Sequence, residues 1–289
     1  MAPLAPRDDR ILPVTRAAAA VVIAILLLAW IVLFVFPSDT DHRFAWTIQP
    51  TMTAMLMGAG YGSALYFFVR VLTERRWHRV ALGFLPTTVF TWMMLGATFL
   101  HWEKFRHGSA PFLLWLWVYL ITPVGVPGVW LVNRRHDPGT TAEGDATFPR
   151  WVRGAMAAAG LMMCAIAAWM YLVPSSAISV WPWALTPLTS RAVASFVALP
   201  GVAWLAMASD ERWSAARVVL GTVAIGLVLL LVAVARAWHE FDHSNPLSFL
   251  YVAGLAGTLG AIGALSAWMR SDGRERDGDG VGERRVTLR

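Results

Sequence analysis

The chain has little charge, a single cysteine and a single lysine. Charged residues make up 15% of its 289 residues and apolar residues 57%, which leaves too few charges to cover a soluble globule of this size. Cys164 has no second cysteine to pair with, so an internal disulfide and a thiolate metal cluster are excluded. Lys104 is the single lysine among 24 basic residues, a bias typical of GC-rich coding sequences. The composition therefore predicts a protein that lipid solvates.

Several motifs of soluble enzymes are also missing. There is no Gly-rich phosphate loop followed by lysine, no nucleophile elbow and no His-Glu-x-x-His zinc motif, so no soluble type of enzyme is supported. The formal net charge of +6 would point to nucleic acid in a soluble protein. Here the arginines lie between apolar runs, where they determine topology, so we expect no nucleic-acid partner. The expected surroundings are the lipid bilayer.

Eight apolar segments are each long enough to cross the hydrocarbon core as a helix, which takes about 20 residues. We place them at residues 15–36, 46–72, 79–100, 111–132, 152–173, 184–208, 214–238 and 248–269. The first follows arginines, as a secretory signal would, but its apolar run is too long and no small-residue cleavage site follows it. The predicted fold class is therefore an all-α membrane protein with eight transmembrane helices.

The basic residues lie mostly on one side of these spans. When the lysines and arginines are counted in alternate loops, 19 lie on the side that carries both termini and 4 lie on the other side. The remaining one, Arg191, lies inside a span. Lys and Arg are enriched in cytoplasmic loops, so both termini are predicted to be cytoplasmic in a multi-pass protein of the cell membrane. Residues 1–14 form a cytoplasmic N-terminal segment. Residues 271–289 alternate arginine with acidic residues and glycine, which predicts a disordered cytoplasmic tail.

A duplication runs through the chain, because rare residues recur at a nearly constant offset. Pro37 and Pro174, Trp46 and Trp183, and Pro50 and Pro187 are 137 residues apart, whereas Trp77 and Trp213, Trp102 and Trp238, Phe105 and Phe241, and His107 and His243 are 136 apart. The offset predicts two four-helix repeats, residues 15–132 and 152–270, joined by a turn-rich cytoplasmic linker at 133–151. Each unit has an even number of spans, so the repeats are parallel and an axis along the membrane normal relates them.

The segment Trp181-Pro-Trp-Ala-Leu-Thr-Pro-Leu-Thr189 resembles a string in uncharacterised multi-pass membrane proteins of high-GC Gram-positive bacteria. The resemblance covers that segment and its counterpart from Trp46 to Pro50. It implies a bacterial membrane protein of that kind, and it implies no activity, cofactor or site residue.

Histidines gather on the side of the spans that lies opposite the termini. The loop after the third span of each repeat carries two of them, His101 with His107 and His239 with His243, and carboxylates lie nearby. Imidazole and carboxylate are ligands for zinc, copper and iron, so these four histidines are candidates for a metal or haem site. His107 and His243 are expected at equivalent places, each next to a tryptophan. The alternative is that polar residues populate a solvated loop.

Arg191 is an ionisable residue inside a predicted span, where a charge costs about 2.5–3.5 kcal/mol on insertion scales and usually faces the protein interior. Arg236 ends the next span on the same side, and the counterparts of both residues in the first repeat are apolar. The two arginines are candidates for a pocket that binds a carboxylate, a phosphate or a lipid headgroup. The alternatives are that Arg191 reaches the headgroups, or that the arginines pair with Glu240 and Asp242.

Three functions fit these features. The first is a binding or transport protein whose outward-facing pocket takes a small-molecule or lipid ligand. The second is a membrane enzyme or redox protein that holds a metal or haem at its outer face. The third is a non-catalytic accessory subunit of a membrane complex. The spans contain no acidic residue, which favours the third function over a proton-driven carrier, because such carriers generally need titratable groups in the membrane.

Overall fold

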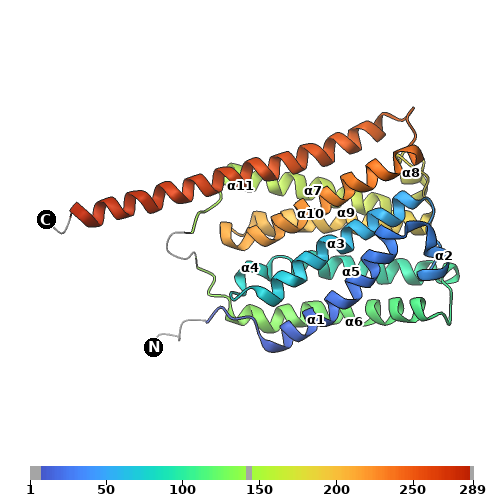
Figure 1. Ribbon diagram of the computed structural model, residues 1–289, viewed down its shortest axis with the longest axis horizontal. Coiled ribbons are helices and arrows are strands. Elements are labelled where there is room, and N and C mark those ends of the chain that lie inside the picture. The colour runs from blue at the N-terminus through green and yellow to red at the C-terminus, as the bar shows by residue number, and fades with distance from the viewer. Residues whose placement is uncertain (1–7, 141–144, 287–289) are drawn as a thin grey trace.

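The computed structural model describes residues 8–140 and 145–286. In this part of the chain, eight helices are long and apolar enough to span a membrane, which confirms the predicted class and number of spans. They run side by side as one bundle (Figure 1). Portions of the predicted terminal segments and linker, at residues 1–7, 141–144 and 287–289, lie outside the described residues.

The spans have the following bounds. In the first half of the chain they are α1 (Pro13–Trp30, continued by a π-helical turn at Ile31–Val35), α3 (Thr51–Thr73), α4 (His78–Ala81) with α5 (Phe84–Leu100), and α6 (Ala110–Asn133). In the second half they are α7 (Arg150–Leu172), α9 (Pro187–Ser209), α10 (Trp213–Ala237) and α11 (Pro246–Val286). Shorter helices are α2 (Thr40–Arg43) and α8 (Pro174–Ile178), with 3-10 turns at Pro37–Asp39, Trp102–Lys104, Arg134–His136 and Trp238–Glu240.

The structure differs from the sequence-based expectation near the C-terminus. α11 continues through residues 271–286, where the mixture of arginine, acidic residues and glycine predicted disorder. Extending an existing helix is easier than starting one, because each added residue brings its own hydrogen bond. The apolar span that begins at Pro246 provides the start that the tail lacks.

The helices pack by the same pattern in the two halves. α1 packs along α3, and α7 packs along α9. α3 then packs on α10 and α9 on α5, so the second span of each half lies against the third span of the other. The third span of each half also packs on the fourth, α5 on α6 and α10 on α11. α3 and α9 also touch each other, and they carry more buried residues than the other described helices.

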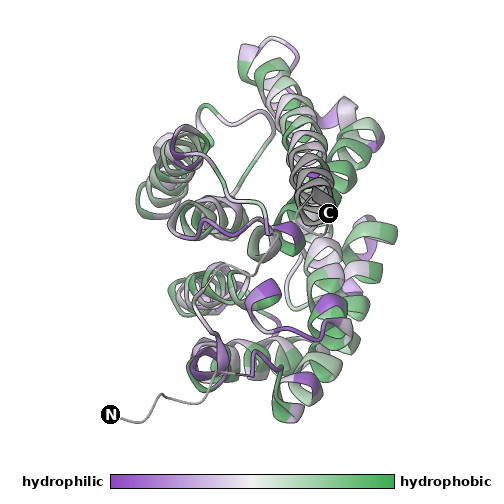
Figure 2. Ribbon diagram, turned by 90° about the vertical axis from the view of Figure 1, so that its left-hand side faces the viewer, coloured by the Kyte–Doolittle hydropathy of each residue, from purple (hydrophilic) through white to green (hydrophobic). Residues whose placement is uncertain are grey.

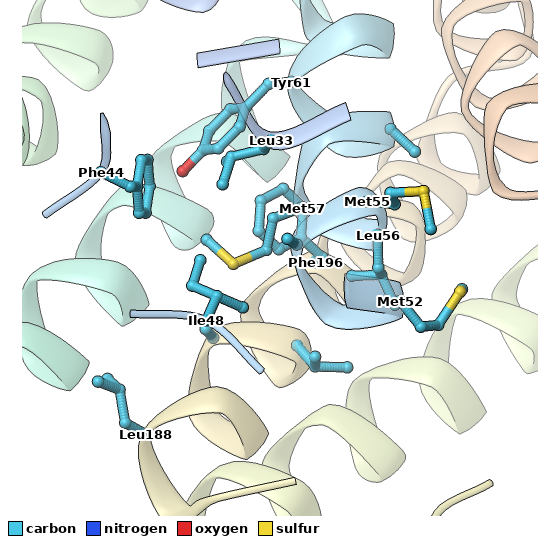
Figure 3. Packing of buried hydrophobic residues seen from close by; sticks show 14 of the residues in the cluster. Leu33, Phe44, Ile48, Met52, Met55, Leu56, Met57, Tyr61, Leu188 and Phe196 are labelled. Carbon is cyan, nitrogen blue, oxygen red and sulfur yellow. The ribbon is translucent and has the colours of Figure 1, made fainter. Parts of the chain in front are cut away.

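The largest cluster of buried side chains surrounds α3 and α9. Figure 3 shows Met57 of α3 near Ile48 and Phe196, with Met52 and Met55 on another side of the same helix, and all five are buried. Methionine is unbranched and fills irregular gaps between helices. Because lipid is as apolar as these side chains, their close packing holds the helices together, rather than the exclusion of water.

Two glycines set the approach of α7 to α9. A Cβ on Gly160 would lie 2.8 Å from the carbonyl oxygen of Gly201, and a Cβ on Gly201 would lie 2.9 Å from the Sγ of Cys164. Non-bonded atoms do not approach so closely, so any larger residue would push the helices apart. The lone cysteine is thus a packing residue at this contact.

The bundle has two chemically distinct ends. We call the end at which α1 begins the basic end and the other, which carries α2 and α8, the opposite end (Figure 1). At the basic end, Arg16 donates hydrogen bonds to the carbonyls of Leu72 and Glu74, and Arg153 donates one to Ala208 at 2.9 Å. Carbonyls at a helix C-terminus lack partners within the helix, so these arginines complete α3 and α9. Figure 2 views this end, where hydrophilic segments join apolar helices.

Candidate functional site

His107 and His243 at the opposite end have matching surroundings. The His107 ring centre lies 4.8 Å from that of Trp102, and the His243 ring centre lies 4.9 Å from that of Trp238. His243 Nε2 also donates to the Trp238 carbonyl at 3.1 Å. The predicted placement of each histidine beside a tryptophan is confirmed.

These histidines do not form a ligand set among the residues that the structure describes. Within residues 8–140 and 145–271, whose side chains the structure describes, no group of three or more His, Cys, Asp and Glu side chains is placed to hold a metal ion. His239 is exposed, and His101 is engaged by an arginine. The four candidate ligands therefore act as ring-stacking, solvent-facing or hydrogen-bonding groups, and a metal or haem site stays a prediction.

Arg191 has a polar partner inside the protein, as predicted. Its Nη1 lies 2.6 Å from Nε2 of His101, and its guanidinium carbon lies 5.9 Å from the centre of the Tyr171 ring. Burial, and then the charge of Arg191, hold the pKa of His101 below its ordinary value, so the neutral imidazole accepts a hydrogen bond from the Arg191 guanidinium. The contact joins α9 to the turn after α5. Substrate binding by Arg191 stays a prediction.

Arg236 does not share a partner with Arg191. Its Nη1 donates to the carbonyl of Phe34 at 2.5 Å, and its guanidinium carbon lies 5.5 Å from the Phe34 ring centre. Phe34 belongs to the π-helical turn that ends the first span. Arg236 therefore joins α10 to α1. The two arginines contact different neighbours, each through one hydrogen bond, and a joint anion pocket stays a prediction.

Glu240 also has a partner that sequence reasoning did not find. Its carboxylate accepts from the backbone N–H groups of Thr51 at 3.0 Å and Met52 at 2.7 Å, and from the Thr51 hydroxyl at 2.7 Å. The first N–H groups of a helix lack acceptors and carry a partial positive charge. Glu240 thus completes the N-terminus of α3 across the two halves and is not an ion-pair partner of Arg236.

A cavity of about 530 Å³ lies at the basic end, opposite to the predicted outward-facing pocket. Its walls are formed by α3, by Glu74 and Arg79 between α3 and α5, and by α10 and α11. We call it the arginine cavity. Its polar lining consists of Tyr66, Arg70, Glu74, Arg79, Trp213, Ser214, Arg217, Ser266 and Arg270.

The charges of the arginine cavity are strongly unbalanced, with four guanidinium groups and one carboxylate in its lining. Glu74 is 7% exposed and pairs with Arg70 and with Arg79, whose Nη1 lies 3.3 Å from the Glu74 Oε2. Arg217 and Arg270 are exposed, and no ion pair joins either of them to a residue within 8–140 or 145–271, the part of the chain whose side chains the structure describes. The Nε atoms of Arg70 and Arg79 are buried without a hydrogen-bond partner.

A chain of polar groups reaches the cavity at Ser214, which belongs to its lining. Asp9 accepts from the His78 backbone at 3.0 Å, and its second oxygen lies 2.5 Å from His78 Nδ1. His78 Nε2 lies 3.0 Å from the Ser214 hydroxyl, which donates to Asp145. Asp145 also accepts from the Ser214 backbone at 3.2 Å. Asp9 and Asp145 are 136 residues apart, as are His78 and Ser214, so the duplication offset contained this signal.

Aspartate, histidine and serine are also the residue types of the catalytic triad of a serine hydrolase. The hydrogen bonds among these polar groups instead join two helices. A serine nucleophile must pass its hydroxyl proton to histidine. Here the Ser214 hydroxyl hydrogen is directed to Asp145. The two aspartates each complete a helix start, of α4 and of α10, and His78 with Ser214 connects the two starts.

No protein-family model, no curated protein and no solved structure matches the chain. Function is therefore inferred from the chemistry of the arginine cavity.

Proposed function

We propose that the protein is a binding or transport protein of the cell membrane that takes up an anionic ligand in the arginine cavity. The observation that carries this proposal is the excess of guanidinium groups over carboxylates in one cavity. The strong bias of arginines toward the basic end makes that end cytoplasmic, with both termini inside. The ligand therefore enters from the cytoplasmic side, and not through an outward-facing pocket.

Arginine is suited to this task because its planar guanidinium presents five N–H donors in a fork that matches carboxylate and phosphate oxygens. Glu74 is the single carboxylate in a lining that holds four guanidinium groups. The oxygens of an anionic ligand would balance the charges that Glu74 leaves unpaired.

The position of the cavity between the halves also supports binding or transport. We propose that the halves are parallel repeats, which is supported by the matching pairs α1–α3 and α7–α9 and by Arg16 and Arg153, which complete α3 and α9. Carriers built from repeats place their substrate at the repeat interface. The arginine cavity takes α3 and Arg79 from one half and α10 and α11 from the other.

Calorimetric titration of the purified full chain with inorganic pyrophosphate in a neutral detergent tests this proposal. Wild type should bind saturably. The double variant R217A/R270A should bind about ten- to a hundredfold more weakly, because a hydrogen bond to a charged group contributes about 1.5–3 kcal/mol. Both arginines are exposed, so their loss leaves no buried charge behind.

R75A/R76A is the matched control. It removes the same charge from two exposed arginines at the same end that do not line the cavity. Its affinity should equal that of wild type. Absence of saturable binding by wild type would refute the proposal and favour the accessory-subunit alternative. Equal weakening in both variants would show that only the general charge of the basic end attracts the anion.

A further inference from the structure

We infer that the ligand of the arginine cavity is an amphiphile, in which a phosphate group is joined to a hydrocarbon chain. This inference rests on the proposed function, because it names the class of ligand that the same cavity takes. Its evidence is the distribution of the lining residues along α10 and α11, which divides the cavity into a charged part and an apolar part.

The charged part lies at the ends of the helices. Arg217 lies in the first turns of α10, and Arg270 lies where α11 passes the basic end. Arg70 and Glu74, at the end of α3, and Arg79, in α4, line the cavity at the same level. These groups fit a phosphate, whose oxygens accept several charge-assisted hydrogen bonds at once.

The apolar part continues toward the middle of the bundle. Its lining comprises Val218, Leu220, Gly221 and Ala224 of α10 and Leu259, Ile262 and Gly263 of α11. At 1.5 Å per residue, the lining reaches about 10 Å beyond Arg217 along α10 and about 16 Å beyond Arg270 along α11. A free phosphate would leave this length unused, whereas a hydrocarbon chain would cover its apolar walls.

Small residues keep the apolar part open. A Cβ on Gly263 would meet no atom within 4 Å, whereas a Cβ on Gly221 would come within 3.0 Å of the Tyr66 hydroxyl. The open side of the cavity therefore lies at α11. The total volume of about 530 Å³ falls within the range of about 300–1,000 Å³ that is usual for ligand pockets. It suffices for a phosphate group with part of a chain.

The test combines two measurements on the purified full chain in neutral detergent. Native mass spectrometry after titration with equal amounts of dioleoyl phosphatidic acid and dioleoyl phosphatidylcholine compares two phosphates with the same chains, one of them neutralised by choline. Calorimetry with inorganic pyrophosphate measures the anionic group alone. Wild type should bind phosphatidic acid at least tenfold in preference to phosphatidylcholine. R217A/R270A should lose most of that preference, and R75A/R76A should keep it.

Substitutions on α11 separate the chain from the phosphate. Gly263→Leu places a side chain in open space inside the apolar part. It should lower the occupancy of phosphatidic acid severalfold, and by a larger factor than it lowers the affinity for pyrophosphate. Gly260→Leu is the matched control, because a Cβ there also meets nothing within 4 Å but Gly260 does not line the cavity. If Gly263→Leu aggregates, Ser266→Trp fills the same space from the next turn.

The outcomes distinguish the two proposals. Arginine-dependent pyrophosphate binding without preference for phosphatidic acid would overturn the amphiphile inference and leave the proposed function standing. A preference for phosphatidic acid that Gly263→Leu and Ser266→Trp do not reduce would also overturn it, because the chain would then lie outside the cavity. Failure of both pyrophosphate and phosphatidic acid to bind would remove both proposals.

Discussion

Two corresponding regions at the basic end of the molecule differ in how they are filled. Between α10 and α11 lies the arginine cavity, with Gly221 and Ser266 in its lining. At the offset of 136 residues, the matching positions on α5 and α6 are Leu85 and Trp130. Trp130 packs against the buried cluster of the first half, and the guanidinium carbon of Arg134 lies 4.7 Å from its ring centre. The Trp130 side chain thus packs at the position where the other half has the small Ser266, whereas Leu85 is 47% exposed.

The arginines that line the cavity also differ from the residues at the corresponding positions of the other half. At the same offset, Arg70, Arg79 and Arg217 correspond to three alanines, which are Ala206, Ala215 and Ala81. Only Arg270 has a basic counterpart, Arg134. Each of the first three positions is filled by alanine in the other half, which packs by the same pattern, so the packing does not require the charge there. The concentration of these arginines around one cavity supports the proposed role in binding.

The largest effect that should separate the halves is the loss of Arg212, whose counterpart is Arg76. Arg212 is 8% exposed and forms ion pairs with Asp137 at 2.9 Å and Asp210 at 2.7 Å, whereas Arg76 is exposed. Arg212→Ala should lower the free energy of unfolding by about 3 kcal/mol, because the ion pairs of Arg212 with both carboxylates are lost. Arg76→Ala should change it by less than about 0.5 kcal/mol.

Thermal unfolding of both variants in detergent, followed by tryptophan fluorescence, measures this difference. Equal midpoints for Arg212→Ala and Arg76→Ala would contradict the asymmetry. The Asp137 carboxyl provides a second readout. Burial alone would raise its pKa, but hydrogen bonds from Arg212 and Gly139 and the Arg212 charge hold the pKa below 3.8. The stabilisation by this carboxylate is therefore complete above pH 3.8 and is lost as the pH falls through the lowered value.

A smaller difference should appear at the starts of α3 and α9. Glu240 completes the start of α3, whereas α9 is completed by its own Thr186, whose hydroxyl accepts from the Thr189 N–H at 3.2 Å. Glu240→Ala should lower the free energy of unfolding by about 2 kcal/mol, since hydrogen bonds to a charged group are lost. Thr186→Ala should cost about 1 kcal/mol. A larger cost for Thr186→Ala, in the same unfolding measurement, would show that Glu240 does not hold the halves together.

The smallest effect concerns the contact between His101 and Arg191. Burial and the charge of Arg191 lower the pKa of His101 from 6.5, so the unfolded chain takes up a proton there before the folded protein does. Stability should be complete above pH 6.5, decline as the pH falls from 6.5 to the lowered pKa, and stay level below it. The unfolding midpoint of His101→Gln should lack this decline. A decline of the same size in that variant would assign it to another group.

The eight spans were predictable because apolar length is a local property that each segment carries in full. The places of His107 and His243 were predictable from register, since both follow a tryptophan by five residues. The arginine cavity was not predicted. Arg70, Arg79, Arg217 and Arg270 were interpreted as topology determinants, and the available signal was that three of them correspond to alanine in the other half.

The sequence by itself determined the number of spans, the basic end and the offset between the halves, because length, charge and spacing are properties of the chain read in order. Only the tertiary structure decided that Arg191 bonds to His101, that Arg236 bonds to Phe34 and that Glu240 bonds to α3. Each of these contacts joins helices that are distant in the chain, and a buried polar group bonds to whatever packing brings within about 3 Å. The cavity depends on packing in the same way, since its walls come from helices of both halves and its space from side chains that are small where their counterparts are large.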